Sequence, residues 1–301
     1  MANVYDYVRA AAFLIGFMVL AFQNVNTWMI VDGFMAAVFG VACIVVPVMN
    51  FDLLVTGVRI DPLHVYFLRE IGCTMVATAV LIYLIRNSKD RNVIKTVLCA
   101  RTLALAVYTV RAIYGQWKFT GIFTSAHVWT EVYASAVLLV VSSIQLVRYG
   151  MDLNGRNSGS KVNRYFLYDT ILTGVVAAID ILIPFFIFGF MNTRTDNLHQ
   201  HVFASLGCMN LSAAFITWFA RAFRFNEDKR AVIYFRVTAL SLILVCLLYG
   251  KMVEGLLPDV FDFIFVLLGC LPLSFHAGGF IAMRDRKSSS SAAGYNLRDR
   301  N

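Results

Sequence analysis

The sequence predicts an all-α, polytopic membrane protein, and two observations carry that prediction: the scarcity of charge and the regular return of long apolar stretches. Hydrophobic residues make up 59% of the 301 positions and charged residues only 15%, whereas about a quarter of the residues of a soluble domain are charged. Each apolar stretch is close to the ~20 residues with which a helix crosses ~30 Å of hydrocarbon. A third observation, an internal repeat, predicts how the helices are grouped.

Eight membrane spans are expected in chain order. They lie at residues 28–49, 65–85, 93–117, 125–147, 164–190, 200–220, 231–252 and 260–283. The shorter apolar stretch 8–22 is interpreted as an extra N-terminal span rather than a signal peptide. Asp6 interrupts the basic segment that a signal peptide needs, and no small-residue cleavage site follows.

The distribution of Lys and Arg predicts the orientation. Seventeen of these residues fall in one set of segments and four in the segments between. The rich set consists of 86–95, 147–164, 221–230 and 284–301. By the positive-inside rule this set, with the C-terminus, is expected on the cytoplasmic side. The basic residues form no single block, so the net charge of +8 does not indicate nucleic acid. The expected partners are the lipid bilayer and other membrane proteins.

Two segments 135 positions apart resemble each other. DPLHVYFLREIGC occupies residues 61–73 and DNLHQHVFASLGC occupies 196–208. The match continues downstream in the same register, with Arg101 on Arg236 and Gly115 on Gly250. Each copy holds an even number of spans, so the two copies enter the membrane from the same side and the repeat is parallel.

The repeat divides the chain into five parts. We expect an N-terminal segment with the extra span at 1–27, a first four-helix repeat at 28–147, a cytoplasmic linker at 148–163, a second four-helix repeat at 164–283 and a disordered basic Ser-rich tail at 284–301.

Each repeat has a first helix that ends in a proline, VACIVVPV or IDILIPFF, and the first copy continues with YFLREIGCTMVATAV, with a glycine near the helix start. In these features each half resembles the DoxX-like and p53-inducible four-helix membrane proteins. The resemblance implies a helical bundle and carries over no catalytic residue. The second copy lacks the charged pair Arg69 and Glu70, so a site shared by both halves is not implied.

Two arginines inside predicted spans require acidic partners, because an unpaired charge there costs at least ~2.5 kcal/mol. Arg101 and Arg236 occupy equivalent positions in the two copies, and each copy offers one aspartate near the same side of the membrane. We therefore expect intramembrane ion pairs between Asp32 and Arg101 and between Asp169 and Arg236. Because both members are duplicated, a structural clamp is favoured over a gate or a proton relay.

The repeated D-x-L-H motif has two interpretations. Asp61, His64, Asp196 and His199, with His201 nearby, could form a symmetric metal or proton site on the outer face, since imidazole and carboxylate suit zinc or copper. Alternatively the aspartates are helix caps that accept the first backbone N–H groups of a helix. The capping interpretation is favoured, and no metal or cofactor is assigned.

Four charged residues break the repeat or stand out within it. Glu70, Arg111 and Glu131 face Ser205, Cys246 and Val266 in the second copy. With Asp180 they form a set of ion- or solute-binding candidates: three acids and one base. Arg111 is expected to pair with Glu131.

No P-loop, H-E-x-x-H or G-x-S-x-G motif is present. We therefore expect a non-enzymatic membrane protein with a structural, adaptor or signalling role. The alternative is a small-solute or proton-coupled transporter that uses the intramembrane acids, and a membrane enzyme of lipid or quinone chemistry ranks third.

Overall fold

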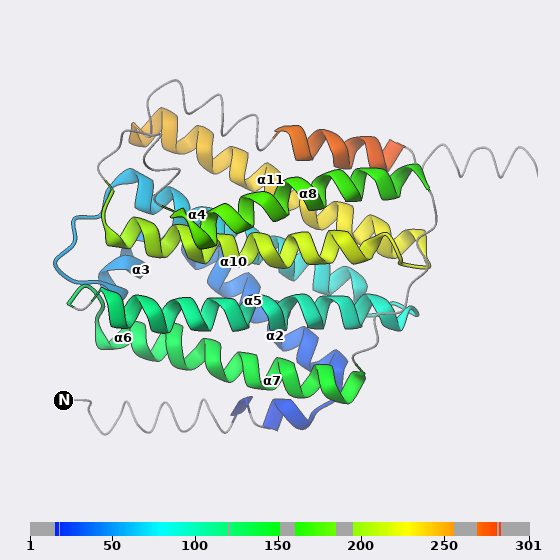
Figure 1. The fold of residues 1–301 in the computed structure, drawn as a ribbon, viewed down its shortest axis with the longest axis horizontal. Helices are drawn as coiled ribbons and strands as arrows, with labels where there is room; N and C mark the ends of the chain where they lie inside the picture. The colour runs from blue at the N-terminus through cyan, green and yellow to red at the C-terminus, as the bar shows by residue number, and fades with distance from the viewer. Residues whose placement is uncertain are drawn as a thin grey trace, which may run out of the picture.

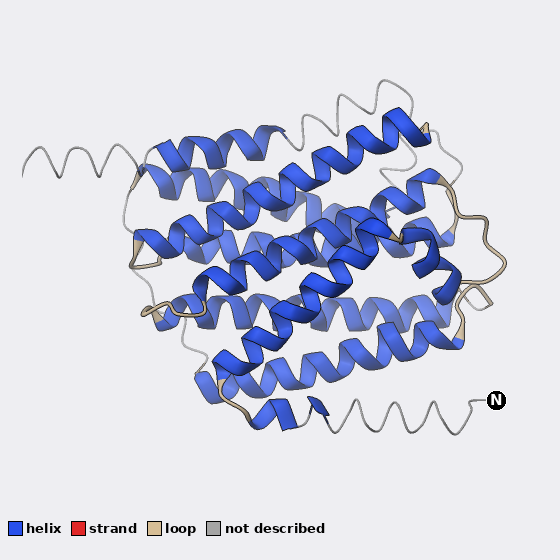
Figure 2. Ribbon diagram, turned by 180° about the vertical axis from the view of Figure 1, so that it is seen from behind, coloured by secondary structure: helices blue, strands red, loops and turns tan. Residues whose placement is uncertain are grey.

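The computed structural model describes residues 16–17, 19–119, 121–150, 160–184, 195–255, 270–281 and 283. These residues form a bundle of long helices that run roughly along one axis (Figures 1 and 2). The helices are α2 (Val25–Val45), α3 (Pro47–Leu54), α4 (Pro62–Ile85), α5 (Arg91–Lys118), α6 (Ser125–His127), the π-helix η1 (Val128–Tyr133), α7 (Ala134–Tyr149), α8 (Lys161–Leu182), α10 (Asn197–Ala220) and α11 (Asn226–Glu254).

Seven of the described helical stretches are long and apolar enough to cross a membrane, with α6, η1 and α7 counted as the single stretch Ser125–Tyr149. The predicted all-helical, multi-pass architecture is confirmed at this level. Of the span expected at 260–283, the structure describes a shorter apolar helix, Cys270–Ile281. The expected extra span at 8–22 lies mostly outside the described residues.

Local chemistry sets the helix boundaries. Asp61 and Asp196 precede α4 and α10 and cap both helices with their side chains. Pro47 has no N–H to continue the ladder of α2, and α2 ends at Val45 with α3 beginning at Pro47 itself. The helix α8 likewise ends at Leu182, shortly before Pro184.

Helices α4 and α10 occupy the centre. Helix α4 packs against α2 and α11, helix α10 packs against α8 and α5, and the two central helices contact each other. Glycines lie between α2 and α4 where these helices pack: a Cβ atom on Gly72 would lie 2.6 Å from the carbonyl oxygen of Gly40. A Cβ on Gly207 would lie 2.6 Å from the Cβ of Asp180 on α8. Small residues therefore allow the backbones within each helix pair to approach closely.

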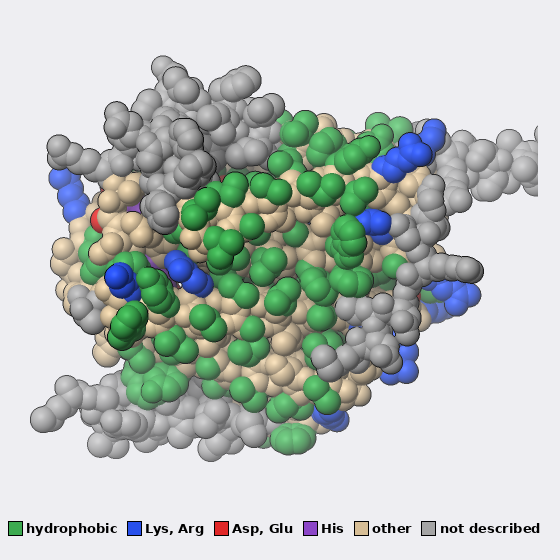
Figure 3. Space-filling view, viewed as in Figure 1, with side chains coloured by type: hydrophobic (Ala, Val, Ile, Leu, Met, Phe, Trp, Pro, Cys, Tyr) green, Lys and Arg blue, Asp and Glu red, His purple; other side chains and the backbone are tan. Residues whose placement is uncertain are grey.

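The middle of the bundle surface is apolar, as a surface in contact with lipid would be. Figure 3 shows hydrophobic side chains across the middle of one face and Lys and Arg side chains toward its ends. Large apolar residues such as Phe34, Ile171 and Leu248 are more than half exposed. One end of the bundle, where α4 and α10 begin and α5 and α11 end, also gathers buried histidines. We call it the histidine end.

Candidate functional site

The structure brings both predicted ion pairs together. The guanidinium of Arg101 donates to the two carboxylate oxygens of Asp32 at 2.9 and 2.5 Å. That of Arg236 donates to both oxygens of Asp169 at 3.0 Å and to Thr173 Oγ1 at 2.7 Å. All four charged residues are buried, and each pair links the first and third long helices of its half of the chain. We call these two ion pairs the clamps.

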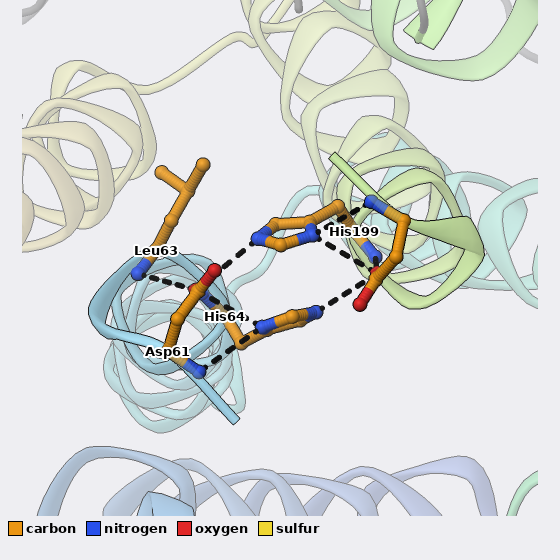
Figure 4. Close-up of polar contacts among 5 residues, drawn as sticks. Asp61, Leu63, His64 and His199 are labelled. Atoms are coloured by element: carbon orange, nitrogen blue, oxygen red, sulfur yellow. Dashed lines mark hydrogen bonds and ion pairs between the residues drawn. The ribbon is translucent and has the colours of Figure 1, made fainter. Parts of the chain in front are cut away.

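The two D-x-L-H motifs meet face to face at the histidine end (Figure 4). The rings of His64 and His199 are stacked, with centroids 3.4 Å apart. Nε2 of His64 lies 3.1 Å from Asp196 Oδ1, and Nε2 of His199 lies 3.2 Å from Asp61 Oδ1. Each aspartate therefore contacts the histidine of the other motif, and we call these four residues the Asp–His clasp.

The Asp–His clasp also caps both central helices. The backbone N–H of Asp61 donates to Nδ1 of His64, and that of Asp196 donates to Nδ1 of His199, both at 3.3 Å. Nδ1 of each histidine also lies 3.0 Å from Oδ1 of the aspartate in its own motif, so each ring contacts both carboxylates of the clasp. The favoured interpretation of the motif is confirmed, because both aspartates cap their helices; the contacts between the two motifs were not predicted.

The electrostatics of the clasp favour ionised aspartates. Partial burial would by itself raise the pKa of Asp61, but hydrogen bonds from His199 and His64 outweigh it and hold that pKa well below its ordinary range. The pKa of Asp196 is lowered in the same way, with the hydrogen bonds of His199 and His64 again overcoming burial.

The four candidates for ion or solute binding have different hydrogen-bonding partners. Among the described residues no hydrogen bond or ion pair joins any two of them. Glu70 accepts a hydrogen bond from Tyr66 at 2.8 Å, and Asp180 accepts one from Asn210 at 3.2 Å. The expected pair of Arg111 with Glu131 is not formed; the guanidinium of Arg111 lies over the ring of Tyr114 instead, 5.3 Å from its centroid.

Glu131 instead faces two histidines. Its Oε2 lies 3.3 Å from Nε2 of His127 and 3.4 Å from Nε2 of His201. The two Nε2 atoms are 3.5 Å apart. Tyr108 donates its phenol proton to the same carboxylate oxygen at 2.9 Å. We call His127, Glu131 and His201 the His–Glu triangle.

Three elements position the triangle. His127 ends α6, Glu131 lies in the π-helix η1 and His201 lies in the first two turns of α10. Single turns of π-helix inside α-helices occur frequently at functional sites. Both histidine side chains are almost wholly buried, while that of Glu131 is 19% exposed. The ring of Phe123 stacks on His127 at 3.9 Å and covers the triangle from one side.

Two groups of described residues have ligand atoms close enough together to hold one metal ion: Asp61 with His64 and His199, and the His–Glu triangle. The triangle was only partly predictable. Glu131 was a candidate, and His201 was noted only as a neighbour of the D-x-L-H motif. The missed residue is His127, although its H-x-x-x-E spacing to Glu131 places both on one face of a helix.

Comparison with known protein families gives a match that covers most of the helical bundle. No curated protein and no solved structure is significantly similar to this chain. The family model described as "Domain of unknown function (DUF8292)" matches residues 30–278. The match begins in α2 and includes the clamps, the Asp–His clasp and the His–Glu triangle. The chain therefore belongs to the DUF8292 family.

Proposed function

We propose that this chain is a multi-pass, non-enzymatic membrane protein that binds a cation at Glu131. The observation that carries the proposal is the set of partners around the Glu131 carboxylate: two imidazoles and a phenol, with no Lys or Arg among the described residues in contact with it. A carboxylate at membrane depth is costly unless a positive charge accompanies it. A bound cation supplies that charge.

A cation bound at Glu131 favours the transporter hypothesis over a purely structural role. In the sequence repeat Val266 aligns with Glu131, which supports the view that the fold does not require an acid at this position. The clamps, by contrast, are present in both halves, and they are the residues to which we assign the structural work.

The architecture we propose for this function is two parallel four-helix repeats, with the histidine end on the non-cytoplasmic side. Two packing equivalences support the repeat: α2 packs on α4 as α8 packs on α10, and α11 packs on α4 as α5 packs on α10. The excess of Lys and Arg in the loops at the opposite end supports the orientation. The resemblance to the DoxX-like proteins stays a prediction.

Thermal unfolding of the purified protein in detergent tests the proposal. The wild-type chain is heated with each of a panel of cations: alkali, alkaline-earth and transition-metal ions, and protons over a pH series. A ligand at a hundred times its dissociation constant stabilises the folded state by about 2.7 kcal/mol. We expect at least one cation to raise the midpoint of the wild-type protein.

Two matched variants complete the test. Glu131→Gln keeps the shape of the side chain and removes its charge, so it should unfold near the wild-type midpoint and lose the cation response. Glu70→Gln removes another buried acid whose hydrogen bond comes from Tyr66, and it should keep the response. If no cation stabilises the wild-type protein, or if Glu131→Gln responds equally, the proposal is wrong.

A further inference from the structure

We infer that the cation is a divalent transition metal of the zinc type, held in four-coordinate geometry by His127, Glu131 and His201. The inference rests on the proposed function and specifies the class of cation that the site takes.

The spacing of the three ligand atoms supports this geometry. They are separated by 3.3, 3.4 and 3.5 Å. In a tetrahedral zinc site with metal–ligand distances of ~2.0–2.1 Å, neighbouring ligand atoms are about 3.3–3.4 Å apart. A point close to the plane of the three atoms lies about 2.0 Å from each of them, which is a bonding distance to zinc. The same separations are long for direct hydrogen bonds, which fall at about 2.7–3.2 Å.

Protonation supports a metal as well. Nδ1 of His127 lies 3.0 Å from the side-chain oxygen of Gln116. That oxygen can only accept, so Nδ1 carries the proton and Nε2 of a neutral His127 presents a lone pair to the triangle. In this neutral form two acceptors, Nε2 of His127 and the carboxylate oxygen of Glu131, face each other at 3.3 Å. A cation between them removes the repulsion, and Gln116 orients the ring as partners of metal-bound histidines do.

His201 is held in place by packing. Its Nδ1 is buried and has no hydrogen-bond partner in the described part of the chain. The ring lies directly against Gly115, where an added Cβ would approach Nδ1 to 2.5 Å. Glycine at this position on α5 thus makes room for the imidazole and leaves Nε2 directed at Glu131 and His127.

The donor set selects the metal. Two neutral imidazole nitrogens and one carboxylate oxygen suit zinc and its neighbours in the first transition row, whereas magnesium and calcium prefer oxygen ligands throughout. Three protein ligands leave the fourth position for water or another exchangeable ligand, as in zinc sites that are not purely structural.

The Asp–His clasp does not share this geometry, although it also contains two histidines and a carboxylate. Its imidazoles are stacked, with an angle of 29° between the rings. The lone pair of an imidazole nitrogen lies in the plane of its ring. In two stacked rings these planes are roughly parallel, so the lone pairs do not converge on one ion. Its ring nitrogens also already have hydrogen-bond partners. In the triangle the rings of His127 and His201 are inclined at 60°.

Metal content and cobalt spectroscopy test the inference. The detergent-purified chain is stripped with a chelator and then titrated with zinc in competition with a chromophoric chelator. We expect one zinc per chain. Cobalt in the same site should give the intense visible bands of four-coordinate Co²⁺, which Glu131→Gln and His201→Gln should abolish. The matched control is His64→Gln, which removes a buried histidine of the clasp and should retain zinc.

A second variant separates a ligand role from a general loss of fold. Gln116→Leu removes only the acceptor of the His127 proton and should weaken zinc binding about 10- to 100-fold while the protein elutes as a folded species. Zinc binding that is unchanged in His201→Gln, or a weak six-coordinate cobalt spectrum, overturns the inference. If calcium, magnesium or protons alone stabilise the wild-type protein at Glu131, this inference fails and the proposed function stands. If no cation does so, both fail.

Discussion

The two buried clamps permit an internal comparison, because removal of the arginine leaves different surroundings in each half. Asp32 has no other hydrogen-bond partner in the described part of the chain than Arg101. Asp169 keeps a long hydrogen bond from Thr173 at 3.4 Å, and His276 Nε2 lies 3.3 Å from its Oδ1. We therefore predict that Arg101→Met destabilises the protein more than Arg236→Met.

The magnitude follows from burial. Breaking a buried pair by removing one partner typically costs about 3–5 kcal/mol, because the remaining charge is left unpaired. We expect a cost in this range for Arg101→Met. The contacts that remain on Asp169 should reduce the cost of Arg236→Met by about 1 kcal/mol, the usual net value of a hydrogen bond.

The assay is equilibrium unfolding in mixed micelles for the single variants, for Asp32→Asn and for the Asp32→Asn, Arg101→Met double variant. The double variant should be more stable than the sum of its single losses implies, because no unpaired charge remains. Additive losses in that cycle would refute pairing. A cost for Arg236→Met equal to or above that for Arg101→Met would refute the role given to Thr173 and His276.

Three further predictions concern other parts of the molecule. A protease-sensitive tag after Asn301 should be cut only when the cytoplasmic face of the membrane is accessible; cleavage from outside intact cells would reverse the orientation. The pKa values of Asp61 and Asp196 are lowered in the folded protein, so the stability they contribute is present above their unfolded pKa of about 3.9 and is lost as the pH falls toward the folded values. The thermal unfolding midpoint of the wild-type protein should therefore drop below about pH 4. It should change less in the variant with both residues replaced by Asn. Gly115→Ala should weaken metal binding, because its Cβ meets the ring of a ligand, whereas Gly174→Ala, whose Cβ has only an ordinary contact at 3.9 Å, should bind metal like the wild-type protein.

Much of the helical architecture was predictable from the sequence. Apolar stretches and the prolines locate the long helices, since the bilayer dictates their length and proline dictates where the ladder breaks. The clamps were predictable too, because a buried arginine requires an acid and each half offers one near the same membrane face.

The His–Glu triangle was harder to predict, because His201 lies 70 positions after Glu131 in the sequence. Nothing in the sequence indicates that α10 approaches α6 and η1, and a π-helical turn has no simple sequence signature. The expected pairing of Arg111 with Glu131 illustrates the difficulty: opposite charge and similar depth favoured it, but the direction of each side chain around its helix decides which partners it meets.

The Asp–His clasp bears on how the protein is made. Each of its cross-contacts joins residues more than 130 positions apart, and the bidentate pair of Arg69 with Glu254 spans 185. During synthesis the first four long helices therefore enter the membrane before the second-half partners of Asp61, His64 and Arg69 have left the ribosome. The early intermediate presents a polar face along α4, which water or an insertion factor must shield until α10 and α11 arrive. A chain truncated after residue 150 should accordingly be retained and degraded, even though it contains every residue of its own clamp.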